Sequence, residues 1–595
     1  MRVADYVFDF FAKRGIRHVF FVSGGGAMHL NDALGRQQSL KYVCNLHEQA
    51  CAIAAEGYAR VTNLPGVVCV TTGPGGTNAL TGVLGAWLDS IPMIVISGQV
   101  KRSTMISSVP NLRLRQLGDQ EADIVSVVRP ITKSATVLMD PVSVRFELEK
   151  AWELARSGRP GPVWLDIPLD VQAAEIANVD ELRPYLSSTK PLAADPSIPE
   201  EVYARLAKAE RPVILAGNGV RLSGCVQEFR EFAERLNIPV LTAISGVDLL
   251  PSTHPLFFGR PGLLGERAAN FILQNADLLL VLGTRMNLRL LSYAYDGFAR
   301  EAFKIMVDVD EAEFYKPTLK IDLPVVSDAG AFIGMLKDFS PLAPKSAWLS
   351  YCTDKRTRYP IVTDEHRSVK EYVSSYMLAE QVSNRLSGTE IIVTGNGIAY
   401  TSTFQAIRLC EGNRMFGNVG CASMGYDLPA AIGAAFAGSG RKVICFTGDG
   451  SIQMNLQEIQ TILNYRLPIK IILLNNDGYL SIKHTQKGFF DGRFVGSHPP
   501  SGVILPDMAK ICSAYGLRYG SAKNNEQLGK ALSELMAGDE PALCEVFCDP
   551  FEVVGPKSAT RKLADGTLVS SPLEDLYPFL PREEFYANMI VKPIS

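Results

Sequence analysis

The sequence has little of what marks a membrane, secreted or nucleic-acid-binding protein. None of its apolar runs approaches the roughly 20 residues of a membrane span, and its first residues predict an amphipathic helix without a signal-peptide core. The 11 cysteines include no CxxC pair, which argues against a disulfide framework or a zinc site. The net charge of −3 gives no global case for binding nucleic acid or anionic lipid. These absences predict a cytoplasmic protein with no nucleic-acid or membrane partner.

What is present predicts several α/β domains. A length of 595 residues suggests about three or four domains. Two stretches with prolines and weak periodicity, 183–200 and 340–370, read as linkers and divide the chain into thirds. Each third alternates apolar strands with helical segments, the pattern of doubly wound parallel sheets. We expect domains at 1–182, 195–340 and 371–550, followed by a C-terminal tail at 551–595.

The outer thirds share a pattern. In the first, a strand at Val67–Thr71 runs into a glycine-rich turn, and a helical stretch then leads to Ile91-Pro92 and another strand. In the last, the order is strand, Gly448, helix, Leu467-Pro468 and strand. This predicts two lobes of related build, although any two βαβ units look partly alike. In the middle third, Gly217-Asn218-Gly219 follows a strand, which alone is weak evidence for a nucleotide.

The most informative segment runs from Gly448-Asp449-Gly450 to Asn475-Asn476. An apolar strand precedes the first motif, a helical stretch follows it, and a second apolar strand, Ile469–Leu474, leads to the asparagines. Asp449 and Asn476 are therefore expected at the carboxyl ends of adjacent parallel strands, where α/β sheets bind ligands. A carboxylate, an amide oxygen and a nearby backbone carbonyl suit Mg²⁺, and the following helix start suits a phosphate. The alternative is a glycine-rich turn in an ordinary α/β domain.

A second candidate group lies in the first third. Glu48 begins an alanine-rich helical stretch, so its carboxyl is expected in an apolar place, where it can hold or share a proton near neutral pH. For Glu48 taken alone, a favourable contact with the helix dipole is the other explanation.

Together these motifs identify a family resemblance. The segments that carry it are Asn45 to Arg60, Thr72 to Asn78, Asp89 to Met93, Ser97 to Gln99, Gln120 to Asp123, Gly425 to Gly433 and Gly448 to Asn476. Their residues and order resemble the acetolactate synthase branch of the thiamine diphosphate (ThDP) enzymes over about residues 1–550. The resemblance implies a pyrimidine-binding domain, a central domain that binds FAD in many relatives, and a pyrophosphate-binding domain. It also implies a homodimer or homotetramer with active sites at the subunit interface.

Site roles follow from the same resemblance. Glu48 would bond the aminopyrimidine ring of ThDP, with Met424 beneath the cofactor and Gln120 in a loop on the substrate side. Asp449, Asn476 and the backbone carbonyl of Gly478 would hold Mg²⁺. The remaining cofactor contacts would come from Gly397, Ala422, Gly448, Gly450 and Ser451. His29 and His47 lie near these loops, where a proton-shuttling role and a structural role both stay open.

The sequence departs from the family on the acceptor side. Asp119 stands where relatives have Phe, Lys101-Arg102 follows Gly98-Gln99-Val100, and the loop 481–495 has no Trp. We expect a more polar and more cationic acceptor side, although Lys101 and Arg102 as a solvated pair is an equal alternative. Leu264 replaces a His usual in FAD-binding relatives, which leaves FAD open. The tail resembles those of relatives from deoxysugar and polysaccharide pathways and is expected to fold over the active site.

These observations favour a ThDP- and Mg²⁺-dependent carboligase. It would decarboxylate pyruvate or a similar 2-keto acid and pass the acyl anion to a carbonyl acceptor, either a second keto acid or a keto-sugar. The alternatives on the same cofactor are simple decarboxylation, C–C hydrolysis and flavin-linked oxidation. A binding subunit without catalysis is disfavoured, because Glu48, Asp449 and Asn476 are all present.

Overall fold

Three parallel sheets form the framework of the chain in the computed structural model, which describes residues 1–187, 192–562, 565 and 567–594. Residues 188–191 of the expected first linker lie outside this description. The first sheet contains β1 His18–Phe21, β2 Lys41–Cys44, β3 Gly66–Val70, β4 Met93–Gln99, β5 Ser134–Val137 and β6 Pro162–Pro168. The central sheet contains β7 Pro212–Ala216, β8 Val240–Thr242, β9 Leu278–Leu282, β10 Phe303–Asp308 and β11 Leu323–Val326. The last contains β12 Ile391–Thr394, β13 Arg414–Gly417, β14 Val443–Gly448, β15 Ile469–Asn475, β16 Arg518–Ala522 and β17 Ala542–Phe547.

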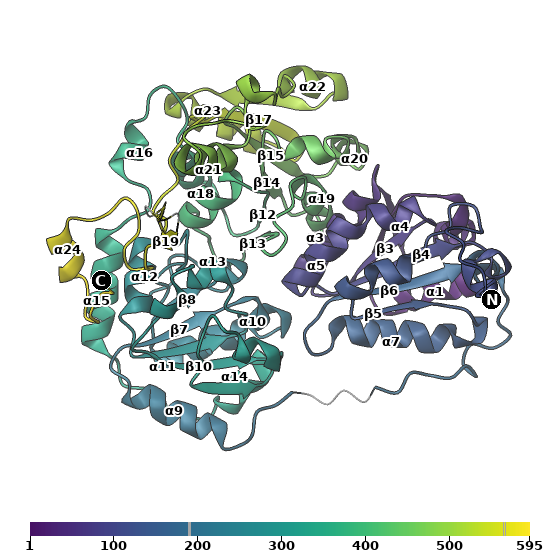
Figure 1. The fold of residues 1–595 in the computed structure, drawn as a ribbon, viewed down its shortest axis with the longest axis horizontal. Coiled ribbons are helices and arrows are strands. Elements are labelled where there is room, and N and C mark those ends of the chain that lie inside the picture. The colour runs from purple at the N-terminus through teal and green to yellow at the C-terminus, as the bar shows by residue number, and fades with distance from the viewer. Residues whose placement is uncertain (188–191, 563–564, 566, 595) are drawn as a thin grey trace.

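Helices cover both faces of each sheet (Figure 1). The first domain has α1 Val3–Lys13, α2 Met28–Arg36, α3 Glu48–Thr62, α4 Pro74–Asn78, α5 Leu80–Asp89, α6 Ile124–Val128, α7 Val144–Arg156 and α8 Leu169–Ala173. The central domain has α9 Ile198–Lys208, α10 Asn218–Leu222, α11 Val226–Leu236, α12 Arg267–Gln274, α13 Leu288–Leu291, α14 Ala329–Met335 and α15 Ser346–Arg358. The last has α16 Asp364–Ser368, α17 Ser375–Ser383, α18 Ile398–Ala406, α19 Asp427–Ala437, α20 Glu458–Asn464, α21 Leu480–Phe489, α22 Met508–Tyr515 and α23 Asn525–Met536. None of the helices in the described residues is long and apolar enough to cross a membrane.

The two outer domains are topological copies, as the shared pattern predicted. The first sheet has the order β2-β1-β3-β4-β6-β5 and the last has β13-β12-β14-β15-β17-β16, which is the same order counted from each domain's first strand. The central sheet, β11-β10-β9-β7-β8, is also doubly wound. In all three sheets every pair of neighbouring strands is parallel, which confirms the predicted fold class.

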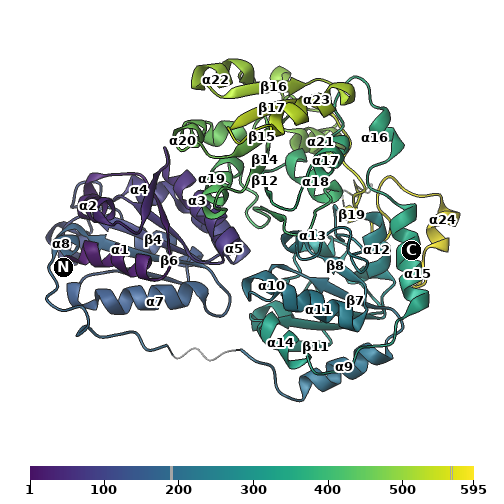
Figure 2. The same cartoon turned by 180° about the vertical axis from the view of Figure 1, so that it is seen from behind.

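The first and last domains meet through α3 and α19, which lie side by side in Figures 1 and 2. Small residues allow this close packing. A Cβ added to Gly433 would lie 1.8 Å from the carbonyl oxygen of Ala54, and one added to Gly57 would lie 2.4 Å from that of Ala430. The alanine-rich sequence of α3 therefore serves an interdomain contact, and Glu48 at its start is positioned by this packing.

Two expectations about the connecting segments are wrong. Residues 340–370, expected as a linker, contain α15 and α16, because Trp348 and Cys352, four positions apart, are buried on one face of α15. The first tail residue, Phe551, lies against Lys483 and Lys487 of α21, but from Leu573 onward the tail packs on the central domain rather than over the expected active site. There Arg267 donates to Leu576 O, Gln274 to Glu574, and Lys355 to Asn588. Its helix α24 Arg582–Ala587 lies beside α15 (Figure 1).

Candidate active site

The predicted metal ligands meet at the carboxyl ends of β14 and β15. The Asp449 carboxylate accepts hydrogen bonds from the backbone N–H groups of Gly450 at 2.8 Å, Asn476 at 3.1 Å and Gly478 at 2.9 Å. Asp477, with φ 58°, and Gly478, with φ 114°, are both left-handed, which turns the chain around the carboxylate. Burial raises the pKa of Asp449 to about 6, and the three N–H donors oppose that rise.

The oxygen donors of this loop fit a hard cation. Asn476 is buried, and its side-chain oxygen Oδ1 has no hydrogen-bond partner among the described residues. Such a buried oxygen without a partner is costly unless something fills the place. The backbone carbonyl of Asn476 accepts from the buried Lys483 Nζ at 2.7 Å, and this bond ties the loop to α21. A carboxylate and an amide oxygen held this way match the ligand preference of Mg²⁺.

Open space beside this loop suits an anion. Gly397, with φ 60°, has its nearest neighbour 4.0 Å from where a Cβ would lie, and Gly448 has no atom within 4 Å of that place. Gly450 differs, since a Cβ there would meet the ring of Tyr479 at 2.3 Å. The hydroxyl of Ser451 ties loops together: it accepts from Gly425 N at 3.0 Å and donates to the Asp427 carboxylate at 2.7 Å.

Ala422 and Met424 lie in the loop between β13 and α19. Ala422 has φ 53°, a strained value for alanine, and its carbonyl oxygen accepts from Asn396 Nδ2 at 2.7 Å. A second lone pair on that oxygen remains available for another donor. Met424 is 37% exposed, so its apolar side chain is free to contact a cofactor.

Glu48 and Gln120 belong to a separate group on the first domain. Glu48 is buried at the first turn of α3, and its carboxylate accepts from Asn78 Nδ2 at 3.0 Å. Gln120, with φ 60°, packs on the turn before α4, because a Cβ on Gly73 would lie 2.3 Å from its carbonyl oxygen. Among the described residues, no hydrogen bond or ion pair joins Glu48 or Gln120 to the Asp449 group.

Sequence reasoning missed the residue that holds the Glu48 loop. Glu458, fully buried on α20, accepts from Asn45 Nδ2 at 2.8 Å and from Leu46 N at 2.9 Å. Burial raises the pKa of Glu458. Nothing in the local sequence around Glu458 points to this role, because its partners are more than 400 positions away.

The predicted entrance cation Arg102 is occupied elsewhere. Its Nε forms an ion pair with Asp170 at 2.7 Å, and its Nη1 donates to the carbonyl of Met139 at 2.9 Å. The interpretation of Arg102 as a free substrate-attracting cation is therefore wrong, and the guanidinium instead joins three segments of the first domain.

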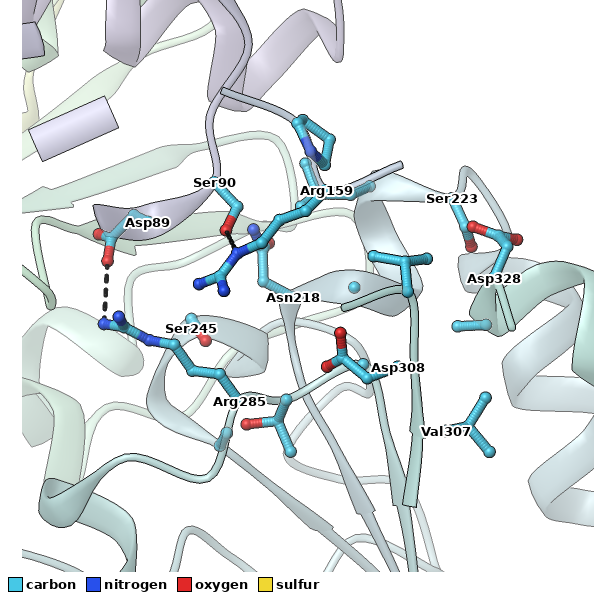
Figure 3. Close-up of a pocket in the computed structure, with 18 of the residues that line it drawn as sticks. Asp89, Ser90, Arg159, Asn218, Ser223, Ser245, Arg285, Val307, Asp308 and Asp328 are labelled. Carbon is cyan, nitrogen blue, oxygen red and sulfur yellow. Dashed lines mark hydrogen bonds and ion pairs between the residues drawn. The ribbon is translucent and has the colours of Figure 1, made fainter. Parts of the chain in front are cut away.

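A cavity of about 400 Å³ lies at the carboxyl end of the central sheet (Figure 3). Its wall includes Asn218 after β7, Arg285 after β9 and Asp308 at the end of β10, with Asp89 and Arg159 from the first domain. Burial raises the pKa of Asp308 to about 6. Gly217 and Gly219, which suggested a nucleotide, pack against the Gly283–Thr284 turn, where added Cβ atoms would lie 2.4 to 2.6 Å from their neighbours. Leu264 does not line this cavity; it lies in a smaller adjoining one.

Two lobes of the same topology, a loop whose carboxylate and amide oxygens suit a hard cation, and a buried glutamate on the first lobe are the features expected of ThDP-dependent enzymes. Sequence comparison agrees. Residues 1–123, 200–336 and 395–546 match the N-terminal TPP binding domain, the central domain and the C-terminal TPP binding domain of thiamine pyrophosphate enzymes.

Within this class, the chain is similar to acetolactate synthase large subunits. It is 34% identical to the isozyme 1 large subunit of Escherichia coli, covering 93% of this chain and 95% of that one. It is 32% identical to the large subunit of Lactococcus lactis, covering 91% and 92%, and 32% identical to a probable large subunit of Methanocaldococcus jannaschii, covering 93% of each. The chain belongs to the acetolactate synthase-like family of ThDP-dependent enzymes.

Proposed function

We propose that the chain is a carboligase that decarboxylates pyruvate or a similar 2-keto acid and joins the remaining acyl unit to a carbonyl acceptor. One C–C bond breaks to release CO₂ and one forms to the acceptor carbon, so no external oxidant is required. The observation that carries the proposal is the Asp449 loop, whose buried Asn476 oxygen lacks a partner beside the open space at Gly397 and Gly448. ThDP bound there supplies a carbon nucleophile that adds to the keto acid and stabilises the charge left by decarboxylation.

The residues of the chain divide the remaining work. Asp449 and Asn476 would hold Mg²⁺ against the diphosphate, and Gly478 would add its carbonyl oxygen. Glu48 would share a proton with the aminopyrimidine ring, since its carboxylate is buried and, among the described residues, Asn78 is the one side chain bonded to it. Ala422 O and Met424 would orient the cofactor, and Gln120 would face the substrate. Burial of the site disfavours a carboxylate relative to the neutral product of CO₂ loss.

We infer an acceptor that is larger or more polar than pyruvate, such as a keto-sugar. The segment after the metal loop is α21, and it carries no Trp between residues 481 and 495. Ile482 is 47% exposed, Phe490 54% and Val495 68%, so this side leaves space for a larger substrate. Lys101 is an exposed cation, whereas Arg102 is paired with Asp170.

The central cavity suits an adenine dinucleotide such as FAD. Asp308, at the end of a parallel strand, is the type of residue that bonds ribose hydroxyls in such sheets. Arg285 supplies a guanidinium group for a diphosphate, whereas Arg159 in the same wall is paired with Asp310 and Glu313. Because Leu264 lies outside this cavity, its replacement of His does not exclude the nucleotide half of the ligand.

Product analysis tests the proposal and separates it from the alternatives. The purified protein with ThDP and Mg²⁺ is incubated with pyruvate alone and with pyruvate plus nucleotide-linked keto-sugars, and products are measured by mass spectrometry. A carboligase gives an adduct two carbons larger than the acceptor. Acetaldehyde alone would indicate a decarboxylase, acetate with reduced flavin an oxidase, and cleavage of a diketone without CO₂ a C–C hydrolase.

A further inference from the structure

Asp89, the last residue of α5, lies where all three domains meet. Its side chain is only 7% exposed. Oδ2 accepts from Arg60 Nη2 at 2.6 Å and from the backbone N–H of Val419 at 3.0 Å. Oδ1 accepts from the backbone N–H of Gly420 at 2.9 Å and lies 3.8 Å from Arg285 Nη2 (Figure 3). One carboxylate of the first domain thus holds a loop of the last domain and faces a cation of the central domain.

The loop fits tightly between the acid and the cation. A Cβ added to Gly420 would lie 2.6 Å from Asp89 Oδ1 and 2.9 Å from Arg285 Nη2, so only glycine has room there. Two residues later comes Ala422, held at φ 53°, and then Met424. The position of Gly420 therefore sets the start of the segment that carries two of the predicted ThDP contacts.

The Arg285 guanidinium has further N–H donors available to a ligand in the cavity. A guanidinium has five N–H donors, and the long ion pair with Asp89 is the one side-chain partner found for Arg285 among the described residues. The Arg159 guanidinium reaches the same edge of the cavity, where its Nε donates to Ser90 at 2.9 Å. The Nη1 of Arg159 is already paired with Asp310 at 2.8 Å and Glu313 at 2.7 Å, so Arg285 supplies the guanidinium donors for an anion such as a diphosphate at this edge.

We propose that Asp89 is a positioning residue that couples occupancy of the central cavity to ThDP binding in the same chain. The inference rests on the proposed nucleotide in that cavity. Among the described residues, the one side-chain contact that restrains Arg285 is the 3.8 Å ion pair with Asp89. A bound diphosphate fixes the guanidinium through its free donors, and the fixed guanidinium forms the second wall against Gly420. Because the loop through Ala422 and Met424 is then already ordered, ThDP binding costs less conformational entropy.

The test measures binding rather than turnover. The full-length protein, freed of bound cofactors, is titrated with ThDP and Mg²⁺ in the presence and absence of ADP or FAD as probes, by calorimetry. The expected result is a ThDP Kd lower by about 5-fold or more when a probe is bound, with the same factor for the probe when ThDP is bound. Arg285→Gln should bind ThDP alone as the unmodified protein does, bind the probe more weakly and lose this factor. Asp308→Asn, at another part of the cavity wall, should weaken the probe and keep the factor.

Several outcomes would overturn the inference. A probe that binds while the ThDP Kd changes by less than about 2-fold removes the coupling. Full coupling in Arg285→Gln removes the route through Asp89. If neither ADP nor FAD binds, the nucleotide assignment fails and the inference fails with it, whereas the carboligase assignment is judged separately by its products. Hydrogen exchange of residues 418–424 in the unmodified protein needs no variant: it should slow when ADP binds, and unchanged exchange with bound ADP contradicts the proposal.

Discussion

At the scale of single residues, Glu48 offers the most direct test of the chemistry. Its buried carboxylate, 3.0 Å from Asn78 Nδ2, is placed to share a proton, which an amide cannot do. Glu48→Gln is expected to slow hydrogen–deuterium exchange at C2 of bound ThDP by about 10²- to 10⁴-fold, the usual contribution of acid–base catalysis. The affinity for ThDP should stay close to that of the unmodified protein, which serves as the control. An unchanged exchange rate would remove Glu48 from this role.

Asp449 is the test of the metal assignment. Asp449→Ala removes the charged ligand and the acceptor of three backbone N–H groups, so Mg²⁺-dependent ThDP binding is expected to be lost. The matched control is Asp477→Asn, which removes the charge of an exposed acid in the same loop and keeps a residue type that tolerates its left-handed φ of 58°. Calorimetric titration of ThDP with Mg²⁺ distinguishes them. Equal affinity for the two variants would contradict the assignment.

Asp166 predicts a pH effect on stability. It is buried, accepts from Ser97 Oγ at 2.5 Å and from Gln99 Nε2 at 2.8 Å, and burial raises its pKa to about 7 from 3.8. A carboxyl whose pKa is raised on folding contributes stability below its unfolded pKa, and that contribution is lost as pH rises through the folded value. The thermal midpoint should fall between pH 5 and 8 by more in the unmodified protein than in Asp166→Asn. Equal falls would show that Asp166 does not titrate in this range.

The residues that sequence reasoning located and those it missed differ in a physical way. Asp449 and Asn476 could be placed because both follow strands predicted from apolar runs. Arg102 was misread because its partner Asp170 is brought to it by the fold, 68 positions along the chain. Glu458 was missed for the same reason. A side chain whose partners come from another element carries no local signal of them.

At the scale of elements, the strands were the easiest to predict and the segments around them the hardest. The predicted strand Ile469–Leu474 is β15 short of its last residue, because a run of mostly apolar residues that ends at the two asparagines suits a strand buried on both faces. The helix expected after Gly450 is broken into a 3-10 turn, Ile452–Asn455, and α20. At this break Asn455 Nδ2 donates to Gly425 O at 2.7 Å and to Gln49 Oε1 at 3.3 Å. Gln49 belongs to the first domain, and hydrophobic periodicity cannot predict a contact between domains.

Helix α20 holds the segment before Glu48 through hydrogen bonds to Glu458, and this contact leads to a prediction for α20. Glu458→Ala removes both acceptor oxygens, so the bonds from Asn45 Nδ2 and Leu46 N are lost. We expect faster amide hydrogen exchange at residues 45–47 in the cofactor-free protein and slower C2 exchange of bound ThDP. Gln460→Ala, at an exposed position of the same helix, is the control and should change neither. Slower C2 exchange without faster amide exchange would argue against positioning through this segment.

At the scale of the whole molecule, the order and class of the three domains could be predicted, and the surroundings of the tail could not. The alternation of strands and helices predicts a parallel sheet from local sequence. The glycine and proline positions that the outer thirds share predict that these two domains have the same build. The tail has few apolar runs, and its docking depends on polar contacts from α12 and α15, such as Lys355 to Asn588. Partners of this kind are defined only once the central domain has folded.

The largest-scale prediction concerns the assembly. Within one chain, the first and last domains are joined next to Glu48 through Glu458. The family resemblance nevertheless implies a shared site, with each cofactor between the first domain of one subunit and the last domain of another, and we predict that arrangement. Glu48→Gln and Asp449→Ala should then each be inactive alone. In a mixed dimer, one site collects both substitutions and the other has neither, so about half of the unmodified activity per mixed dimer should return. Co-expression with two different affinity tags isolates the mixed dimer, and product formation is measured. A mixed dimer that forms but stays inactive would place both residues in the same chain's site and remove the shared-site assignment.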